Sequence, residues 1–113
     1  MTGQLRLYGA RGSGAVPVEA ALTLMERPYE LIDSYTFDHD DKESGDKVLA
    51  ANPMRQVPAL VLPSGEVITE SAAILIYLAD RHPASRLAPA PDDPKRGQFL
   101  RWMVFVSSAI YSL

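Results

Sequence analysis

The alternation of hydrophobic and polar residues divides the first third of the chain into a strand, a helix and a second strand. Residues 4–8 alternate between polar and apolar, which predicts a short strand. From Ala15 the apolar positions recur three and four residues apart, as on one face of a helix, and Pro28 is expected to end that helix. Residues 29–33 read as a second strand. Two strands joined through a helix imply parallel pairing with a right-handed crossover.

The second third of the chain predicts a hairpin followed by a helix. Residues 36–44 are polar and acidic and suggest a loop, and residues 47–51 suggest a short irregular helix. Two strands, 59–62 and 66–69, flank a Pro-Ser-Gly turn. Ser71 is expected to cap the next helix, whose apolar residues form one stripe. The order β-α-β and then β-β-α predicts an α/β fold with a mixed four-stranded sheet, the arrangement of a thioredoxin-like domain, over residues 1–82.

A linker rich in Pro and Ala, residues 83–93, leads to a last helix that is expected to span residues 94–113. Residues 99–106 are apolar on nearly every side, and a helix of that kind has to be buried on most of its circumference. Either the chain dimerises through this helix or, as we favour, the sequence is a truncated part of a longer one. A membrane segment is the weakest option, because the run is short and polar residues interrupt or follow it.

Composition and charge argue against several classes of function. The chain has 11 basic and 14 acidic residues, a net charge of −3, and no basic stripe, so neither a nucleic acid nor a membrane surface is the expected partner. The absence of cysteine excludes a disulfide, a Cys-based zinc site and thiol redox chemistry carried by the chain. His39 and His82 lack ligand-like spacing, so no metal site is expected. We find no signal-peptide pattern and no apolar run long enough for a membrane span.

Pro58 stands at the head of the predicted strand 59–62, where it cannot donate a ladder hydrogen bond. It could simply protect the end of the strand. The segments around it, however, resemble glutathione S-transferases of the bacterial type. The stretches "NPMRQVPAL" and "GEVITESAAILIYLADRHP" are similar to the second half of that family's glutathione-binding domain. The stretch "LRLYGARGSGAVPVEAAL" is similar to its first strand, active-site loop and first helix, and "DDPKRGQFLRWMVF" to the start of its all-helical domain.

The resemblance implies a site for glutathione around Pro58 and Ser71. In this family the Val57–Pro58 bond is cis, which turns the N–H and C=O of Val57 outward to pair with the cysteinyl part of glutathione as an added strand. Ser71 would bind the γ-glutamyl carboxylate at a helix N-terminus, and Glu70 would face the ammonium group. Without a ligand, the same two residues would merely cap the helix and favour its dipole.

Arg55 and Gln56 come just before this pair. By resemblance they could hold the glycyl carboxylate of glutathione, Arg55 by its charge and Gln56 by its amide donors. The alternative is that both are solvated loop residues.

The thiol of glutathione has to be ionised, because the thiolate is the nucleophile. The family places a tyrosine, serine or cysteine in the loop after the first strand, and this chain has no cysteine. Ser13 stands between Gly12 and the first helix, where the serine classes carry their hydroxyl, so the resemblance makes it the expected catalytic residue. A hydroxyl aimed at the sulfur lowers the thiol pKa. Tyr8 is the second candidate, and Arg11 could add electrostatic stabilisation. Ser13 could also be only a helix cap, and Gly14 departs from the family pattern.

The resemblance implies a glutathione S-transferase. It would take glutathione as co-substrate and transfer it to an electrophilic small molecule. A homodimer is expected, and a cytoplasmic location follows from the intracellular occurrence of glutathione. One alternative is a non-catalytic glutathione-binding or interaction module with the same fold. Another is a glutathione-dependent isomerase of the zeta class, which "NPMRQVP" resembles. That class carries Ser-Ser-Cys in the loop, where this chain has Gly-Ser-Gly.

Overall fold

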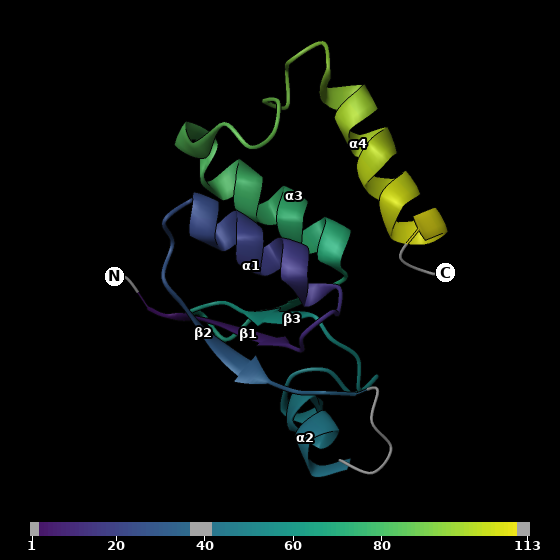
Figure 1. Ribbon diagram of the computed structural model, residues 1–113. Helices are drawn as coiled ribbons and strands as arrows, with labels where there is room; N and C mark the ends of the chain where they lie inside the picture. Colours follow the sequence, from purple (N-terminus) through teal and green to yellow (C-terminus); the bar gives the residue numbers. More distant parts are fainter. Residues whose placement is uncertain (1–2, 37–41, 111–113) are drawn as a thin grey trace.

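The computed structural model describes residues 3–36 and 42–110 of the chain (Figure 1). The strands are β1 (Leu5–Gly9), β2 (Tyr29–Asp33), β3 (Ala59–Val61) and β4 (Val67–Thr69). The helices are α1 (Ala15–Leu24), α2 (Lys42–Asp46), α3 (Ser71–Arg81) and α4 (Arg96–Phe105). Short 3-10 turns cover Lys47–Ala50 and Pro83–Ser85, and a π-helical turn, Val106–Ile110, continues α4.

The four strands form one mixed sheet in the order β2-β1-β3-β4. Strand β2 runs parallel to β1, with Leu5 opposite Tyr29 and Gly9 opposite Asp33, whereas β3 runs antiparallel to both β1 and β4. The parallel pair is joined through α1 and the antiparallel pair by a hairpin. This topology confirms the predicted thioredoxin-like α/β fold.

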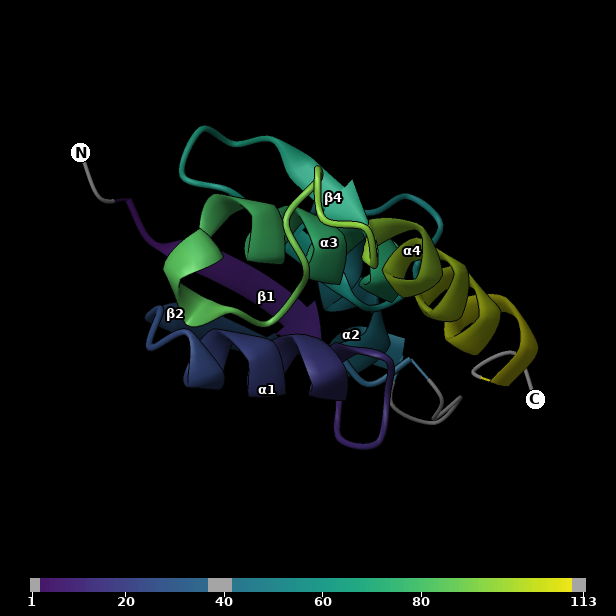
Figure 2. The ribbon, with the colours of Figure 1, turned by 90° about the horizontal axis from the view of Figure 1, so that it is seen from above.

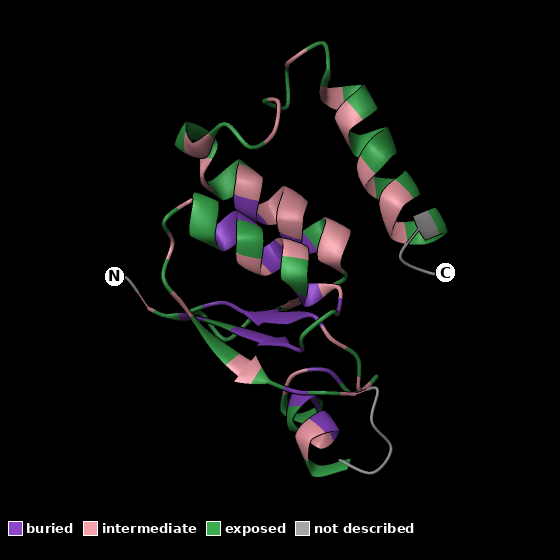
Figure 3. Cartoon of the chain, viewed as in Figure 1, coloured by how far each residue is buried: buried purple, intermediate pink, exposed green. Residues whose placement is uncertain are grey.

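Helices α1 and α3 lie side by side on one face of the sheet, and α2 lies on the other (Figures 1 and 2). Alternate strand residues therefore enter two separate cores. Leu5, Leu7 and Leu60 pack beneath α1 and α3, together with the fully buried Leu22 and Ile74. The smaller core on the α2 side contains Tyr8, Val48, Ala59 and Val61. Figure 3 shows buried residues concentrated on the inner strands and on the facing sides of α1 and α3.

Several predicted boundaries were wrong for local physical reasons. Helix α1 ends at Leu24, four residues before Pro28, because Glu26 takes a left-handed conformation with φ 55°. Helix α4 begins at Arg96 rather than at residue 94, because the Asp93 side chain accepts a hydrogen bond from the Lys95 N–H and closes a turn first. Part of the predicted loop 36–44 is helical, since α2 begins at Lys42; the rest of that loop, residues 37–41, lies outside the described residues.

Helix α4 stands apart from the other helices at the end of the linker (Figure 1). None of its residues is buried, and Trp102, Val104 and Phe105 are about half exposed. Phe99 and Met103 point toward α1 and α3 and line a small apolar cavity with them. Within residues 3–36 and 42–110, no helix has the length and hydrophobicity that crossing a membrane requires.

Candidate functional site

A cavity of about 440 Å³ lies where the N-terminal ends of α1 and α3 meet the loop before β3. Five elements supply its walls: the start of α1, the segment after β2, the loop before β3, the β4–α3 junction and the π-helical turn after α4. The lining residues are Gly14, Thr36, Asn52, Gln56, Val57, Pro58, Thr69, Glu70, Ser71 and Ser107. The cavity thus brings together residues from two separate segments, 56–58 and 70–71.

Glu70 and Ser71 form the junction between β4 and α3. Glu70 has φ 72° and ψ 116°, a backbone conformation that a residue with a side chain rarely adopts. Its C=O accepts the first helical hydrogen bond, from Ile74. The prediction that Ser71 caps the helix was wrong, because Ser71 is already the first helical residue and its hydroxyl makes no cap bond. No hydrogen bond joins either side chain to another described residue, so both remain available to a ligand.

Val57 and Pro58 lie between the loop and β3. The bond between them is cis, as the resemblance predicted. The sheet pairs of β3 begin only at Ala59, so the N–H and C=O of Val57 lie outside the ladder at the cavity wall. The loop is held by Asn52, whose amide donates to the Gln56 C=O at 2.9 Å and whose Oδ1 accepts from the Met54 N–H at 3.0 Å.

Arg55 does not line the cavity, unlike its neighbour Gln56. Arg55 has φ 54°, and its guanidinium turns toward α2, where Nε lies 2.6 Å from Oδ1 of Asp46. Its Nη2 also donates to the Lys42 C=O at 3.4 Å. The hydrogen bond from Arg55 is the main reason why the pKa of the Asp46 carboxyl falls below its ordinary value, and Lys42 adds a smaller Coulombic contribution.

Ser13 is buried, with 4% of its surface exposed, and it does not line the cavity. Its hydroxyl donates to the Ala10 C=O at 2.6 Å and accepts from the N–H groups of Ala10 and Ala15 at 3.2 and 3.1 Å. Ser13 therefore closes the loop and caps α1. The neighbouring Gly14 lines the cavity instead: a Cβ placed on it would lie 3.4 Å from Cδ of Pro58 and 3.9 Å from Oγ of Ser71.

The other two candidates for thiol activation lie elsewhere. Tyr8 is buried in the core on the α2 side of the sheet, packed with Val48 and Ala59, and does not line the cavity. Arg11 is exposed and also stays outside the lining.

Sequence reasoning did not single out four of the residues that shape the cavity. Asn52 directly follows the predicted short helix 47–51, and only its side-chain bonds reveal that it organises the loop. Thr36, Thr69 and Ser107 are ordinary polar residues in sequence, and only the tertiary arrangement brings them together. Within the described parts of the chain, no three His, Asp or Glu side chains gather as a metal site would require; His39 lies outside them.

Comparisons with known proteins point to one family. Residues 13–81 match the family model for the N-terminal domain of glutathione S-transferase. An uncharacterized GST-like protein, YncG, of Escherichia coli K12 is 36% identical over 107 residues, which are 95% of this chain and 51% of that protein. A probable maleylacetoacetate isomerase of Caenorhabditis elegans is 37% identical over 91% of this chain and 46% of its own length.

The likeness extends to solved structures. A sphingomonad glutathione S-transferase in complex with glutathione superposes with a TM-score of 0.82 at 35% identity, covering 95% of this chain and 53% of that one. The chain thus spans about half the length of the proteins that it matches.

Proposed function

Because this chain belongs to the glutathione S-transferase family, we propose that it binds glutathione in the cavity between the starts of α1 and α3 and transfers the thiolate to an electrophilic small molecule. The observation that carries the proposal is the convergence of Gln56, Val57, Glu70 and Ser71 on one cavity. Taken from Ser71 back to Gln56, these residues face complementary groups of a γ-glutamyl tripeptide: a carboxylate, an ammonium group, a peptide backbone and a second carboxylate.

The γ-glutamyl end of glutathione would bind at the start of α3. The free N–H groups of the first turn and the helix dipole favour a carboxylate there, and the Ser71 hydroxyl adds a donor. The Glu70 carboxylate then faces the ammonium group next to that carboxylate. Both charges of the ligand are matched by adjacent residues, which a helix cap alone would not require.

The rest of the tripeptide would extend along the loop before β3. The Val57 N–H and C=O would pair with the cysteinyl residue as an added strand, which is a general mode of peptide binding. The Gln56 amide would bind the glycyl carboxylate. Arg55 is not assigned that role here, since its guanidinium is directed to Asp46.

The sulfur would then lie near Gly14, next to Pro58. Its thiolate would be stabilised by the Gly14 main-chain N–H and by the dipole of α1. Ser13 enters this proposal as a positioning residue, because its hydroxyl holds the loop and already donates its proton to Ala10. For Ser13 to donate a hydrogen bond to the sulfur, its hydroxyl would first have to break its hydrogen bond to the Ala10 C=O.

Glutathione would act as a co-substrate, and the acceptor electrophile would approach on the α4 side of the cavity, where Ser107 lies. A homodimer and a cytoplasmic location are parts of the same proposal. An isomerase that uses glutathione is the second candidate, and the likeness to the C. elegans isomerase favours it. Assays with an aromatic halide and with maleylacetoacetate distinguish the two reactions.

The test is calorimetric titration with glutathione of the wild-type chain and two variants, Glu70→Gln and Ser71→Ala. Each variant is expected to weaken binding about 10-fold, since each removes a hydrogen bond to a charged group worth about 1.5 kcal/mol or more. Glu66→Gln is the matched control: it removes an exposed carboxylate from the β3–β4 turn, outside the cavity. Failure of the wild type to bind glutathione would overturn the proposal.

A further inference from the structure

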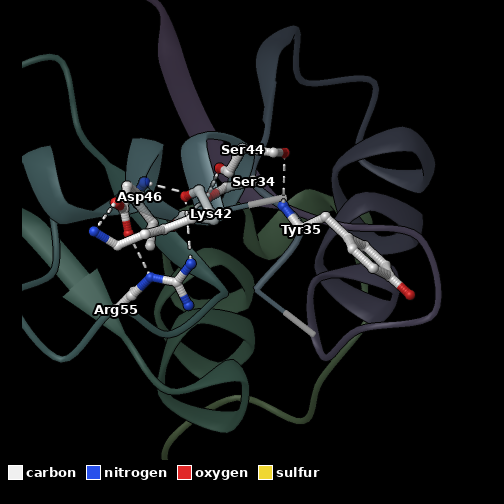
Figure 4. A network of polar contacts seen from close by, with 8 residues as sticks. Ser34, Tyr35, Lys42, Ser44, Asp46 and Arg55 are labelled. Atoms are coloured by element: carbon white, nitrogen blue, oxygen red, sulfur yellow. Dashed lines mark hydrogen bonds and ion pairs between the residues drawn. The ribbon is translucent and has the colours of Figure 1, made fainter. Parts of the chain in front are cut away.

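A cluster of polar contacts joins α2 to the loop before β3 (Figure 4). We call Ser34, Asp46 and Arg55, with the main chain that they bind, the α2 clamp. The Arg55 guanidinium bonds to the Asp46 carboxylate at 2.6 Å and to the Lys42 C=O at 3.4 Å, so it reaches both ends of the helix. It also packs against Gly45, where a Cβ would overlap Nη2 of Arg55.

Ser34 fixes the other side of α2. It is fully buried, and its hydroxyl donates toward the C=O groups of Ser44 and Gly45 at 3.0 and 3.1 Å and accepts from the Val48 N–H at 3.1 Å. Its own N–H donates to the Gly9 C=O at 2.8 Å, which ties the clamp to the end of β1. Helix α2 has one buried residue, Gly45, so these polar contacts rather than hydrophobic burial hold it in place.

The clamp adjoins the cavity on two segments. Arg55 immediately precedes Gln56, and Ser34 lies two residues before Thr36; both Gln56 and Thr36 line the cavity. The Arg55 backbone is left-handed, a conformation that costs an L-residue energy, although an asparagine or glycine would adopt it more easily. An arginine at this position is explained by the reach of its side chain to α2.

We propose that Arg55 is a positioning residue for the glutathione site: it never touches the ligand, but through Asp46 and α2 it fixes the loop that presents Gln56 and Val57. This inference rests on the proposed function. The wall of the site that would receive the glycyl end is built from the segment after β2 and the loop before β3. The α2 clamp connects these two segments. Loosening the clamp leaves the γ-glutamyl end of the site, at Glu70 and Ser71, intact.

The test measures glutathione affinity by calorimetry, with folding of every variant verified by circular dichroism. Asp46→Asn keeps the shape of the side chain and removes its charge. Arg55→Lys keeps the charge and removes the guanidinium group, which reaches both the Asp46 carboxylate and the Lys42 C=O. Each is expected to weaken binding about 3- to 10-fold, the usual range for coupling through a packed network. The double variant is expected to lose no more affinity for glutathione than the weaker-binding single variant, because both substitutions break the same contact.

Two further variants separate positioning from general stability. Asp46→Glu keeps a carboxylate that can pair with Arg55, so it is expected to bind glutathione more tightly than Asp46→Asn. This difference would show that the affinity depends on the ion pair itself. Arg96→Lys is the matched control, because Arg96 forms a similar pair with Asp80 at 3.2 Å, outside the cavity lining. It is expected to bind glutathione within about 2-fold of the wild type, a change well under 1 kcal/mol.

The outcomes are distinct. If the wild type binds glutathione and the folded Asp46→Asn and Arg55→Lys variants bind equally well, the positioning role is wrong and the proposed function stands. If Arg96→Lys weakens binding as much as Arg55→Lys, the effect is a general loss of stability and the positioning role is again wrong. If the wild type does not bind glutathione, the proposed function fails and this inference falls with it.

Discussion

Replacing Ser13 with alanine separates a structural role of its hydroxyl from a catalytic one. The hydroxyl makes three hydrogen bonds within the loop, and alanine makes none of them. Losing a helix cap costs about 1 kcal/mol. The Ala10 N–H is then left buried without an acceptor, since Ala10 is only 3% exposed, and this adds about 1–3 kcal/mol. We therefore expect Ser13→Ala to lower the free energy of unfolding by about 2–4 kcal/mol.

Urea denaturation followed by far-ultraviolet circular dichroism measures this loss. Circular dichroism is preferable to fluorescence, because the single tryptophan, Trp102, lies on the exposed side of α4 and reports poorly on the core. With a slope of about 1.5 kcal/mol/M, a loss of about 3 kcal/mol moves the midpoint by roughly 2 M. Ser85→Ala is the control: its partly buried hydroxyl makes one bond, to the His82 C=O, so a loss of less than about 1 kcal/mol is expected.

The refuting result is equally definite. If Ser13→Ala unfolds at the same urea concentration as the wild type but no longer conjugates glutathione to an aromatic halide, then the hydroxyl acts on the sulfur. Our assignment of Ser13 to loop structure would be wrong.

Three more changes follow from the structure. Gly14 has φ −62° and ψ −7°, which any residue accepts, so Gly14→Ala should raise the free energy of unfolding by about 0.4–1 kcal/mol; a lower urea midpoint would show that the contact with Pro58 is too tight. Ile74 is fully buried, so Ile74→Ala should lower the free energy of unfolding by about 2–5 kcal/mol in thermal denaturation, and a loss below about 1 kcal/mol would contradict the packing. Arg55 lowers the pKa of Asp46, so the stability that their ion pair contributes is fully present above pH 3.8. This stability is lost as the pH falls through the folded-state pKa of Asp46. The free energy of unfolding should therefore fall less for Asp46→Asn than for the wild type between about pH 5 and pH 2. An equal fall in both proteins, measured by urea denaturation at each pH, would refute this.

Periodicity was sufficient to predict the sheet and the two helices that cover it. Strand β2 has the predicted bounds, 29–33, and begins directly after Pro28, the predicted boundary between helix and strand. Helix α3 runs from Ser71 to Arg81, close to the prediction, because its apolar stripe is long and regular. The cavity residues from Gln56 to Ser71 were found through the motif that contains them.

The remaining features depend on contacts that sequence does not encode locally. Helix α2 carries almost no apolar pattern, and its position depends on Ser34 and Arg55, which are distant along the chain. A serine in a glycine-rich loop looks the same whether its hydroxyl faces a ligand or, as for Ser13, its own backbone. The direction of the Arg55 side chain follows from a left-handed backbone angle that its residue type does not predict.

The backbone of Glu70 has a consequence for laboratory evolution of this chain. Its positive φ is a conformation in which glycine is more stable than glutamate, by about 1 kcal/mol or more. A library selected only for heat resistance should therefore accumulate Glu70→Gly, and each such survivor would have lost the carboxylate that faces the cavity. Selection that alternates heat with capture on immobilised glutathione should keep the glutamate. The residue found at position 70 thus shows whether a population was selected for heat resistance alone or for heat resistance together with glutathione binding.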